Sequence, residues 1–208
     1  MKVIEQEIHS LKNSISEMWA LVHQQLYNAG EAMLTGDKEL AYKVISRERR
    51  VNAFELKIDS DCEDIIALYA PVAIDLRFVL AMYKINTNLE RLGDFAESIA
   101  RFAGNLPEGE PIDPQLVKET RVEEMLSELL SMISLTKEAF EKESSEIASR
   151  IFLKDNLIDE INHNSTAIIA KYIEEHKGSA LAGLYQKNGT FRRSLYEYSG
   201  RTHFLSGR

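Results

Sequence analysis

Apolar positions recur every three or four residues over long stretches of the chain, which is the spacing of one face of an α-helix. In the N-terminal half this spacing predicts a helix from about residue 4 to residue 34 and a second from about residue 38 to the residue before Pro71. A third carries the apolar row Ile85, Leu89, Leu92, Ala96, Ile99 and Ala103. Three long helices with short connections predict an up-down-up bundle.

The C-terminal half repeats this organisation after a segment rich in proline and glycine. Three of the four prolines lie in "GNLPEGEPIDP", residues 104–114, so we assign 1–104 to a first three-helix unit and 105–114 to a linker. The pattern then predicts a fourth helix over 115–143 and a fifth over 145–176. We therefore expect an all-α chain of two tandem three-helix bundles, in which the second, residues 115–178, lacks its last helix.

The two halves also resemble each other in sequence. Placing "VNAFELKID", residues 51–59, over "DNLIDEINH", residues 155–163, aligns Asn52 with Asn156 and Glu55 with Asp159. Both segments lie in the second predicted helix of their unit. This agreement supports an internal repeat, which is typical of tandem architectures.

Composition narrows the class of protein. The chain has 208 residues, 44% of them apolar and 28% charged, which is typical of a soluble globular protein. The formal net charge of −8 argues against nucleic acid as the main partner and leaves cations and proteins. No apolar run reaches the roughly 20 residues that a bilayer span needs, so we expect a cytoplasmic protein without direct membrane insertion. A single cysteine, Cys62, fits a reducing compartment and is interpreted as core packing.

Two pairs of carboxylates stand out on the predicted second and third helices. Glu55 and Asp59 are four residues apart, as are Glu90 and Asp94, and each pair lies at the edge of its buried stripe. If these helices pack antiparallel, the four carboxylates converge on one groove, where a hard divalent cation would find oxygen ligands. Gly93 costs its helix about 1 kcal/mol relative to alanine, which predicts close approach of a neighbouring helix or ligand.

The second half offers a weaker version of the same pattern. Asp155, Asp159 and His163 descend one helix face at four-residue steps. A histidine in such a row favours a transition metal over calcium. The expected cofactors are therefore divalent or transition metal ions, with iron, zinc, manganese and magnesium all open.

Three readings of these carboxylates remain open at this stage. The first is a metal site, and the second is a metal-free helical adaptor whose acidic faces are solvated or paired with Arg77 and Arg91. The third is a carboxylate-bridged di-metal enzyme, which usually needs a Glu-x-x-His motif on each of two helices. Only Glu160 with His163 supplies that motif, so we do not expect an enzyme.

One segment resembles a known family. "CEDIIALYAPVAIDLRFVLAMYKINTNLERLGDFAESIA", residues 62–100, is similar to the PhoU family of phosphate-transport regulators, whose repeats carry "PVA-x-DLR" and "LERIGDHA-x-NIA" segments. The resemblance implies two tandem three-helix bundles that bind clustered metal ions through Glu/Asp-x-x-x-Asp motifs. Here those motifs are Glu55 with Asp59, Glu90 with Asp94, and Asp155 with Asp159.

The resemblance also implies a function without catalysis. Members of the family repress phosphate uptake and the phosphate-starvation response by contacting the phosphate ABC transporter and its sensor histidine kinase. We therefore expect a metal-binding regulatory adaptor, peripheral at the inner membrane through its partners, with homo-oligomerisation open. Phe95 departs from the family pattern, which has histidine after the aspartate, and this change implies loss of a hydrogen bond or ligand near the site.

The C-terminal tail departs further. Residues 179–208 read "SALAGLYQKNGTFRRSLYEYSGRTHFLSGR", without helical periodicity, and the second "ERIGD" segment is absent near residue 190. Allowed codons for this tail, read one base later, give "VLLLVSIRKMERLGDHYTNIAEEHIFYLE", which restores an amphipathic helix with the family motif. We hypothesise a frameshift near Gly178 and exclude the tail from functional reasoning.

Overall fold

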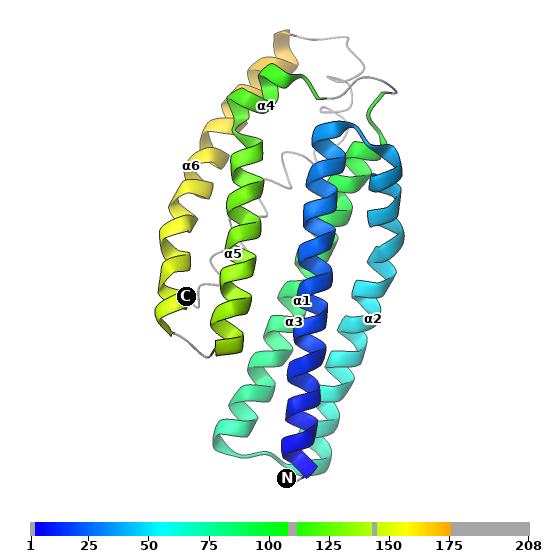
Figure 1. Cartoon of the computed structure of the whole chain (residues 1–208), viewed down its shortest axis with the longest axis vertical. Coiled ribbons are helices and arrows are strands. Elements are labelled where there is room, and N and C mark those ends of the chain that lie inside the picture. Colours follow the sequence, from blue (N-terminus) through cyan, green and yellow to red (C-terminus); the bar gives the residue numbers. More distant parts are fainter. Residues whose placement is uncertain (1–2, 108–111, 143–144, 176–208) are drawn as a thin grey trace.

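The computed structural model describes residues 3–107, 112–142 and 145–175, which form six helices with no strand among them. The helices are α1 (Val3–Thr35), α2 (Lys38–Tyr69), α3 (Ala73–Gly104), α4 (Pro114–Thr120), α5 (Val122–Lys142) and α6 (Ser145–Glu175). The predicted all-α class is confirmed. Figure 1 shows α1, α2 and α3 side by side as one long bundle, with α5 next to α1 and α6 beyond α5.

Local sequence sets the turns between the first three helices. Asp37 begins α2, because its side chain accepts a hydrogen bond from the backbone N–H of Leu40 at 2.9 Å. Gly36 precedes it at φ 72°, in the left-handed region where glycine is favoured. At the other end, Ala70 caps α2 at φ 44° and Pro71 follows. These signals divide the chain where the apolar pattern predicts.

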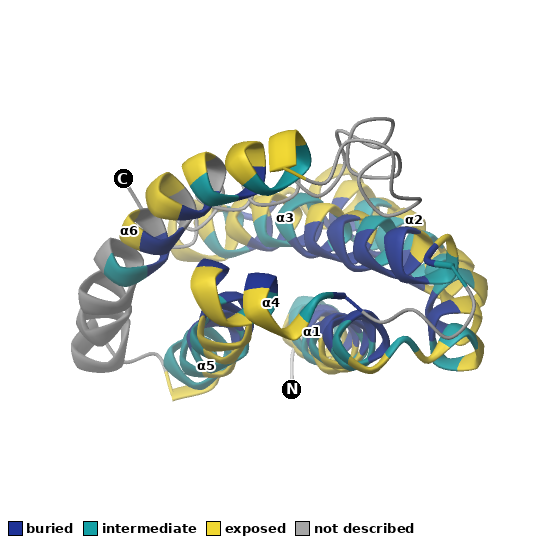
Figure 2. Ribbon diagram, turned by 90° about the horizontal axis from the view of Figure 1, so that it is seen from above, coloured by how far each residue is buried: buried dark blue, intermediate teal, exposed yellow. Residues whose placement is uncertain are grey.

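Most of the buried residues lie on the facing sides of α1, α2 and α3 (Figure 2), and the same core continues onto α4, α5 and α6. α1 also binds the second half. The Trp19 indole Nε1–H donates to the carbonyl of Ile133 on α5 at 3.2 Å, and its ring stacks on Phe140 with centroids 5.9 Å apart. Because Trp19 is fully buried, α1 belongs to both halves of the molecule.

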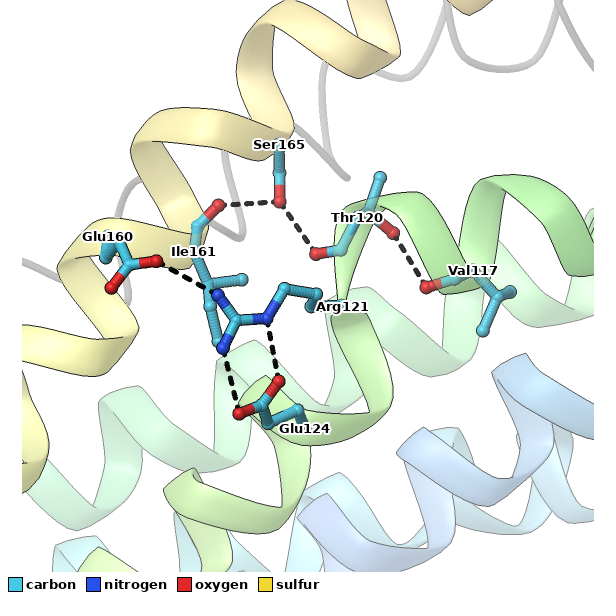
Figure 3. A network of polar contacts seen from close by, with 7 residues as sticks. All are labelled: Val117, Thr120, Arg121, Glu124, Glu160, Ile161 and Ser165. Carbon is cyan, nitrogen blue, oxygen red and sulfur yellow. Dashed lines mark hydrogen bonds and ion pairs between the residues drawn. The ribbon is translucent and has the colours of Figure 1, made fainter.

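The prediction of one continuous fourth helix over 115–143 is wrong. The helix is interrupted at Arg121, which adopts φ 52° and separates α4 from α5. The interruption frees the carbonyl of Thr120, which lies 2.9 Å from the Ser165 hydroxyl of α6 (Figure 3). That hydroxyl shares its one hydrogen between the Thr120 carbonyl and the Ile161 carbonyl of its own helix, at 2.7 Å. Arg121 itself binds Glu124 and Glu160 (Figure 3). Contacts with α6 therefore stabilise the break, and the local sequence pattern could not predict them.

The described ends of the predicted linker, residues 105–107 and 112–114, pack against the rest of the molecule. Leu106 and Ile112 flank residues 108–111, and both are buried in the core. Asp113 then caps α4 by accepting from the backbone N–H of Gln115 at 2.8 Å, with Pro114 at the first helical position. The missing sixth helix and the 179–208 tail lie outside the described residues. None of the described helices is long and apolar enough to cross a membrane.

Candidate functional site

α2 and α3 pack antiparallel with a close contact at Gly93. A Cβ built on Gly93 would lie 2.8 Å from Cγ1 of Val51, closer than real Cβ contacts. Nearer the turn, the Asn86 side chain of α3 reaches the backbone of Glu55 on α2. Residues later in α3 therefore contact residues earlier in α2, as expected for antiparallel helices. The prediction that Gly93 permits close approach of a neighbouring helix is confirmed.

This packing brings the two predicted carboxylate pairs onto one seam. The Asn86 Nδ2 donates to Oδ1 of Asp59 at 2.7 Å, and the charges of Glu55 and Asp94 act on the carboxyl of Glu90. We call the six acidic residues along this line the carboxylate seam: Glu48, Glu55 and Asp59 of α2, and Glu90, Asp94 and Glu97 of α3. Four of the six are the carboxylates that the sequence predicts.

Glu90 shows the strongest effect of this crowding. Burial raises the pKa of its carboxyl, and the charge of Asp94, a hydrogen bond with Asp94 and the charge of Glu55 raise it further, to about 7. Arg91 opposes the shift with the smallest contribution. Glu90 is therefore held between its protonated and ionised forms near neutral pH.

The other glutamates on the α2 side respond in the same direction. Burial raises the pKa of Glu55, followed by the charges of Asp59 and Asp94. Burial also raises the pKa of Glu48, together with the charge of Glu97, while a hydrogen bond from Asn52 lowers it. Arg101, which forms an ion pair with Glu97 at 2.6 Å, opposes the shift at Glu48, but the pKa of Glu48 is still raised.

Sequence reasoning missed four residues of this region. Glu48 and Asn52 extend the row that contains Glu55, and Asn86 and Glu97 extend the row that contains Glu90. A signal for them was present, since their spacing of three or four residues continues each row along its helix face. The prediction stopped at the family motif and so left the ends of the seam out.

The donor atoms of the seam fit a divalent cation in their chemistry. Carboxylate oxygens are the ligands that hard cations prefer, and facing helices of a bundle are known hosts for them. Within the described part of the chain, however, no three His, Cys, Asp or Glu side chains form a group that could hold a metal ion. Binding a cation here therefore requires rotation of side chains that already share one seam.

In the second half, the structure places the predicted residues on α6. Asp155 and Asp159 lie within that helix, and their side chains are outside the described part. His163 is exposed. Oε1 of Glu160 accepts from Nη1 of Arg121 at 3.0 Å (Figure 3), so the one Glu-x-x-His pair has its glutamate engaged in an ion pair.

Two further residues lie in the core. Cys62 is fully buried, and burial raises the pKa of its thiol to about 12, so core packing is confirmed. Phe95 is also buried, at 6% exposure, among the apolar residues of the bundle. Its difference from the family pattern therefore changes core packing, and the loss of a hydrogen bond or ligand at this position stays a prediction.

The fold and the seam define a class: all-helical bundle proteins with a row of carboxylates along the contact between two long helices. The PhoU domain family matches residues 15–103. A phosphate-specific transport system accessory protein PhoU homolog of Aquifex aeolicus is 33% identical over 171 residues, which are 81% of this chain and 75% of that protein. The chain belongs to the PhoU family.

Further relatives and solved structures agree. The PhoU protein of Escherichia coli K12, with the same accessory-protein name, is 34% identical over 154 residues, 74% of this chain and 62% of that protein. The phosphate transport system regulatory protein PhoU from Streptococcus pneumoniae has a similar crystal structure, with a TM-score of 0.82 and 25% identity over 98% of this chain and 93% of that one. PhoU from Pseudomonas aeruginosa shares the fold, with a TM-score of 0.85 over 97% and 94% of the two chains and 24% identity.

Proposed function

We propose that this protein is an accessory regulator of a phosphate-specific transport system, acting through recognition. Family membership and the accessory-protein names of its relatives support this proposal. Like other members of the PhoU family, it would repress phosphate uptake and phosphate-starvation signalling by contacting the transporter and its sensor kinase. Such a role places the protein in the cytoplasm, at the inner face of the membrane.

We further propose that Glu55, Asp59, Glu90 and Asp94 hold a divalent cation. The observation that carries this proposal is the carboxyl of Glu90, whose pKa is raised to about 7 by burial and by its acidic neighbours. A bound cation supplies the positive charge that the seam lacks, and the carboxylates then hold α2 and α3 at a fixed separation. Asp155 and Asp159 would contribute to a second site on α6.

A protein contact needs a surface, and the α2–α3 turn provides one. Four apolar side chains around it are exposed: Leu68 at 72%, Val72 at 73%, Ile74 at 79% and Tyr69 at 36%. We call these four residues the turn patch. Exposed apolar groups that cluster in this way mark interaction sites more often than singly scattered ones do.

The charges around the turn patch favour one kind of occupant. Three exposed acidic residues, Glu63, Asp64 and Asp75, and one exposed basic residue, Arg77, lie within five residues of it in the sequence. This acidic surrounding repels an anionic lipid surface and attracts a protein face with basic side chains. We therefore assign the turn patch to a basic face of the transporter or of the kinase.

Binding measurements with purified partners test this assignment. The probes are the ATP-hydrolysing subunit of the phosphate transporter and the cytoplasmic part of the sensor kinase from the same genome. We expect the Leu68→Asp, Val72→Asp variant to lose at least tenfold in affinity for one of them. Tyr42→Asp, which also replaces a large exposed side chain by aspartate but lies near the start of α2, should leave the affinity unchanged. Equal binding by both variants would contradict the surface assignment.

A cellular assay tests the regulatory role itself. In a strain that lacks its own copy of the regulator, we expect this chain to restore repression of a phosphate-responsive reporter in high phosphate. The Glu90→Ala, Asp94→Ala variant should restore it only in part if the cation shapes the docking surface. Full repression by that variant would favour a metal-free adaptor, the alternative supported by the absence of a ready three-ligand group among the described residues.

A further inference from the structure

The contact between α1 and α5 leaves a hollow near the C-terminal end of α1, which we call the α1–α5 hollow. The two helices lie next to each other (Figure 1), and a Cβ built on Gly30 would lie 3.1 Å from Cδ1 of Leu126. The hollow beside this close contact has a volume of about 320 Å³, within the range of ligand sites. Its floor is apolar, since Leu26 and Leu126 are buried and Leu34 and Leu130 are half-buried.

The charged residues that line the α1–α5 hollow are all acidic in the described part of the chain. They are Glu31 of α1 and Glu123 of α5, and neither carboxylate forms an ion pair or a hydrogen bond with another described residue. Glu123 also lines a neighbouring hollow with Lys118 and Arg121. Arg121 is held there in two ion pairs, and among the described contacts Lys118 forms none with Glu123. Both carboxylates are therefore available to a cation from outside.

An aromatic ring and a small residue complete the rim of the hollow. Tyr27 is 46% exposed and lies one turn before Glu31 on the same face of α1. Ser127 is exposed on α5, one turn after Glu123, and its short side chain leaves the hollow open. A solvated helix face commonly carries such carboxylates, but it does not also combine them with a tyrosine ring above an apolar floor between two helices.

We propose that the α1–α5 hollow takes an arginine side chain of a protein partner. This inference rests on the recognition role proposed above and adds a second contact to it. The aliphatic stem of an arginine would lie on the apolar floor, while its planar guanidinium stacks on Tyr27 and meets Glu31 and Glu123. A lysine offers only a point charge, so arginine matches the rim better.

The hollow and the turn patch are far apart, so the two contacts can be tested separately. The hollow lies where α1 ends, and the turn patch lies where α2 ends, a full helix length away along α2. An arginine inserted between apolar and acidic groups is typical of the few residues that dominate the affinity of an interface. Filling the hollow should therefore weaken binding as strongly as changing the turn patch does.

Binding measurements with the ATP-hydrolysing subunit of the transporter and the cytoplasmic part of the sensor kinase test the hollow. Ser127→Trp fills it without changing its charge, and we expect binding of one partner to weaken by about tenfold or more. Ser46→Trp makes the same change at an exposed position of α2 and should leave the affinity unchanged. Should Ser127→Trp lower the melting temperature, Ser127→Arg takes its place, because it supplies the protein's own guanidinium beside Glu123.

The Glu31→Gln, Glu123→Gln variant tests the chemistry of the occupant. We expect it to lose about tenfold in affinity at low salt and to show a weaker dependence of affinity on salt than the wild type. Glu17→Gln, Glu39→Gln removes two charges from other exposed positions of α1 and α2 and is the control. Unchanged affinity in the hollow variant, together with a loss in Ser127→Trp, would indicate an apolar occupant and overturn the arginine contact.

Failure of this inference and failure of the proposed function give different results. If the wild type binds neither purified partner, the proposed recognition role is contradicted, and the arginine contact with it. If the Leu68→Asp, Val72→Asp variant loses affinity while Ser127→Trp binds as the wild type does, the turn patch stands and the arginine contact is overturned. Loss of affinity in both hollow variants, with both controls unchanged, supports the arginine contact.

Discussion

At the scale of single residues, Gly93 is the position where the sequence pattern and the packing explain each other. Only hydrogen fits at its Cα, because a Cβ would meet Val51 Cγ1 at 2.8 Å. The closeness of the two backbones at this point brings the carboxylates of α2 and α3 within electrostatic reach of one another. The close packing of α3 against α2 thus offsets the cost of a glycine inside the helix.

We predict that Gly93→Ala destabilises the protein by about 1–2 kcal/mol, since overpacking outweighs the gain in helix propensity. Thermal unfolding measures this change. Gly104→Ala is the control, because its Cβ would meet the Tyr42 ring at an ordinary 3.5 Å. Adding Val51→Ala should recover much of the loss, and a Gly93→Ala protein as stable as the wild type would refute the close contact.

A second residue-scale prediction concerns pH. Glu90 holds its proton up to about pH 7 in the folded protein, against a reference value of 4.5. The folded state therefore binds more protons between these values, so stability falls as pH rises from about 4.5 to about 7. Glu90→Gln should remove roughly 1 kcal/mol of this dependence, because solvent screens a partly exposed group.

Chemical unfolding of metal-stripped protein across that pH range measures the effect. The charges of Asp94, Glu55 and Arg91 act on the Glu90 carboxyl, and all three residues are present in both proteins. The comparison with the wild type therefore isolates Glu90, and Glu17→Gln on the exposed side of α1 serves as a control. Parallel pH profiles for wild type and Glu90→Gln would speak against a raised pKa.

At the scale of helices, the break at Arg121 is the main departure from the predicted elements. A left-handed residue other than glycine costs about 1–2 kcal/mol. Its ion pairs with Glu124 and Glu160 are exposed and contribute little. The buried hydrogen bond from Ser165 to the Thr120 carbonyl is the stronger candidate for holding the break in place.

We predict that Ser165→Ala destabilises the protein by about 1–2 kcal/mol, because it leaves the buried carbonyl of Thr120 without that donor. Ser46→Ala is a suitable comparison, since the Ser46 hydroxyl bonds only the nearby Lys43 carbonyl on an exposed helix face. That control should change stability by less than about 0.5 kcal/mol. Equal effects of the two substitutions would mean that Ser165 does not support the break.

Periodicity predicted the elements to the extent that they depend on local sequence. The apolar rows located α1, α2, α3 and α6, and the edges of those rows located four seam carboxylates. The break at Arg121 depends on a hydrogen bond from Ser165, 45 residues past Thr120 in the sequence. Asn86 shows the same limit, because its amide forms hydrogen bonds to Glu55 and Asp59 only when α2 lies beside it.

At the scale of the whole molecule, the two halves are joined mainly through α1 and α5. Trp19 forms a hydrogen bond to α5 and stacks on it, and a Cβ built on Gly30 would lie 3.1 Å from Cδ1 of Leu126 on the same helix. The first half completes a three-helix core by itself, whereas α4, α5 and α6 are all that is described of the second. The frameshift hypothesis, which rests on the sequence, predicts that the second half lacks its last helix.

We predict that a protease cuts the second half before the first, because an incomplete bundle opens more often than a complete one and then exposes its backbone. Replacing residues 179–208 by the shifted-frame sequence, with its "MERLGDH" motif, should restore resistance. Limited proteolysis followed by intact-mass analysis measures both. Equal resistance of the two halves in the original chain would contradict the hypothesis of a lost helix.

The central claim is that the carboxylate seam binds a divalent cation. The most direct test is equilibrium titration of metal-stripped protein with Mn²⁺, comparing the wild type with the Glu90→Ala, Asp94→Ala variant. We expect saturable binding by the wild type and, in the variant, loss of the site formed by α2 and α3. Unchanged stoichiometry in the variant, or no saturable binding by the wild type, would contradict the claim.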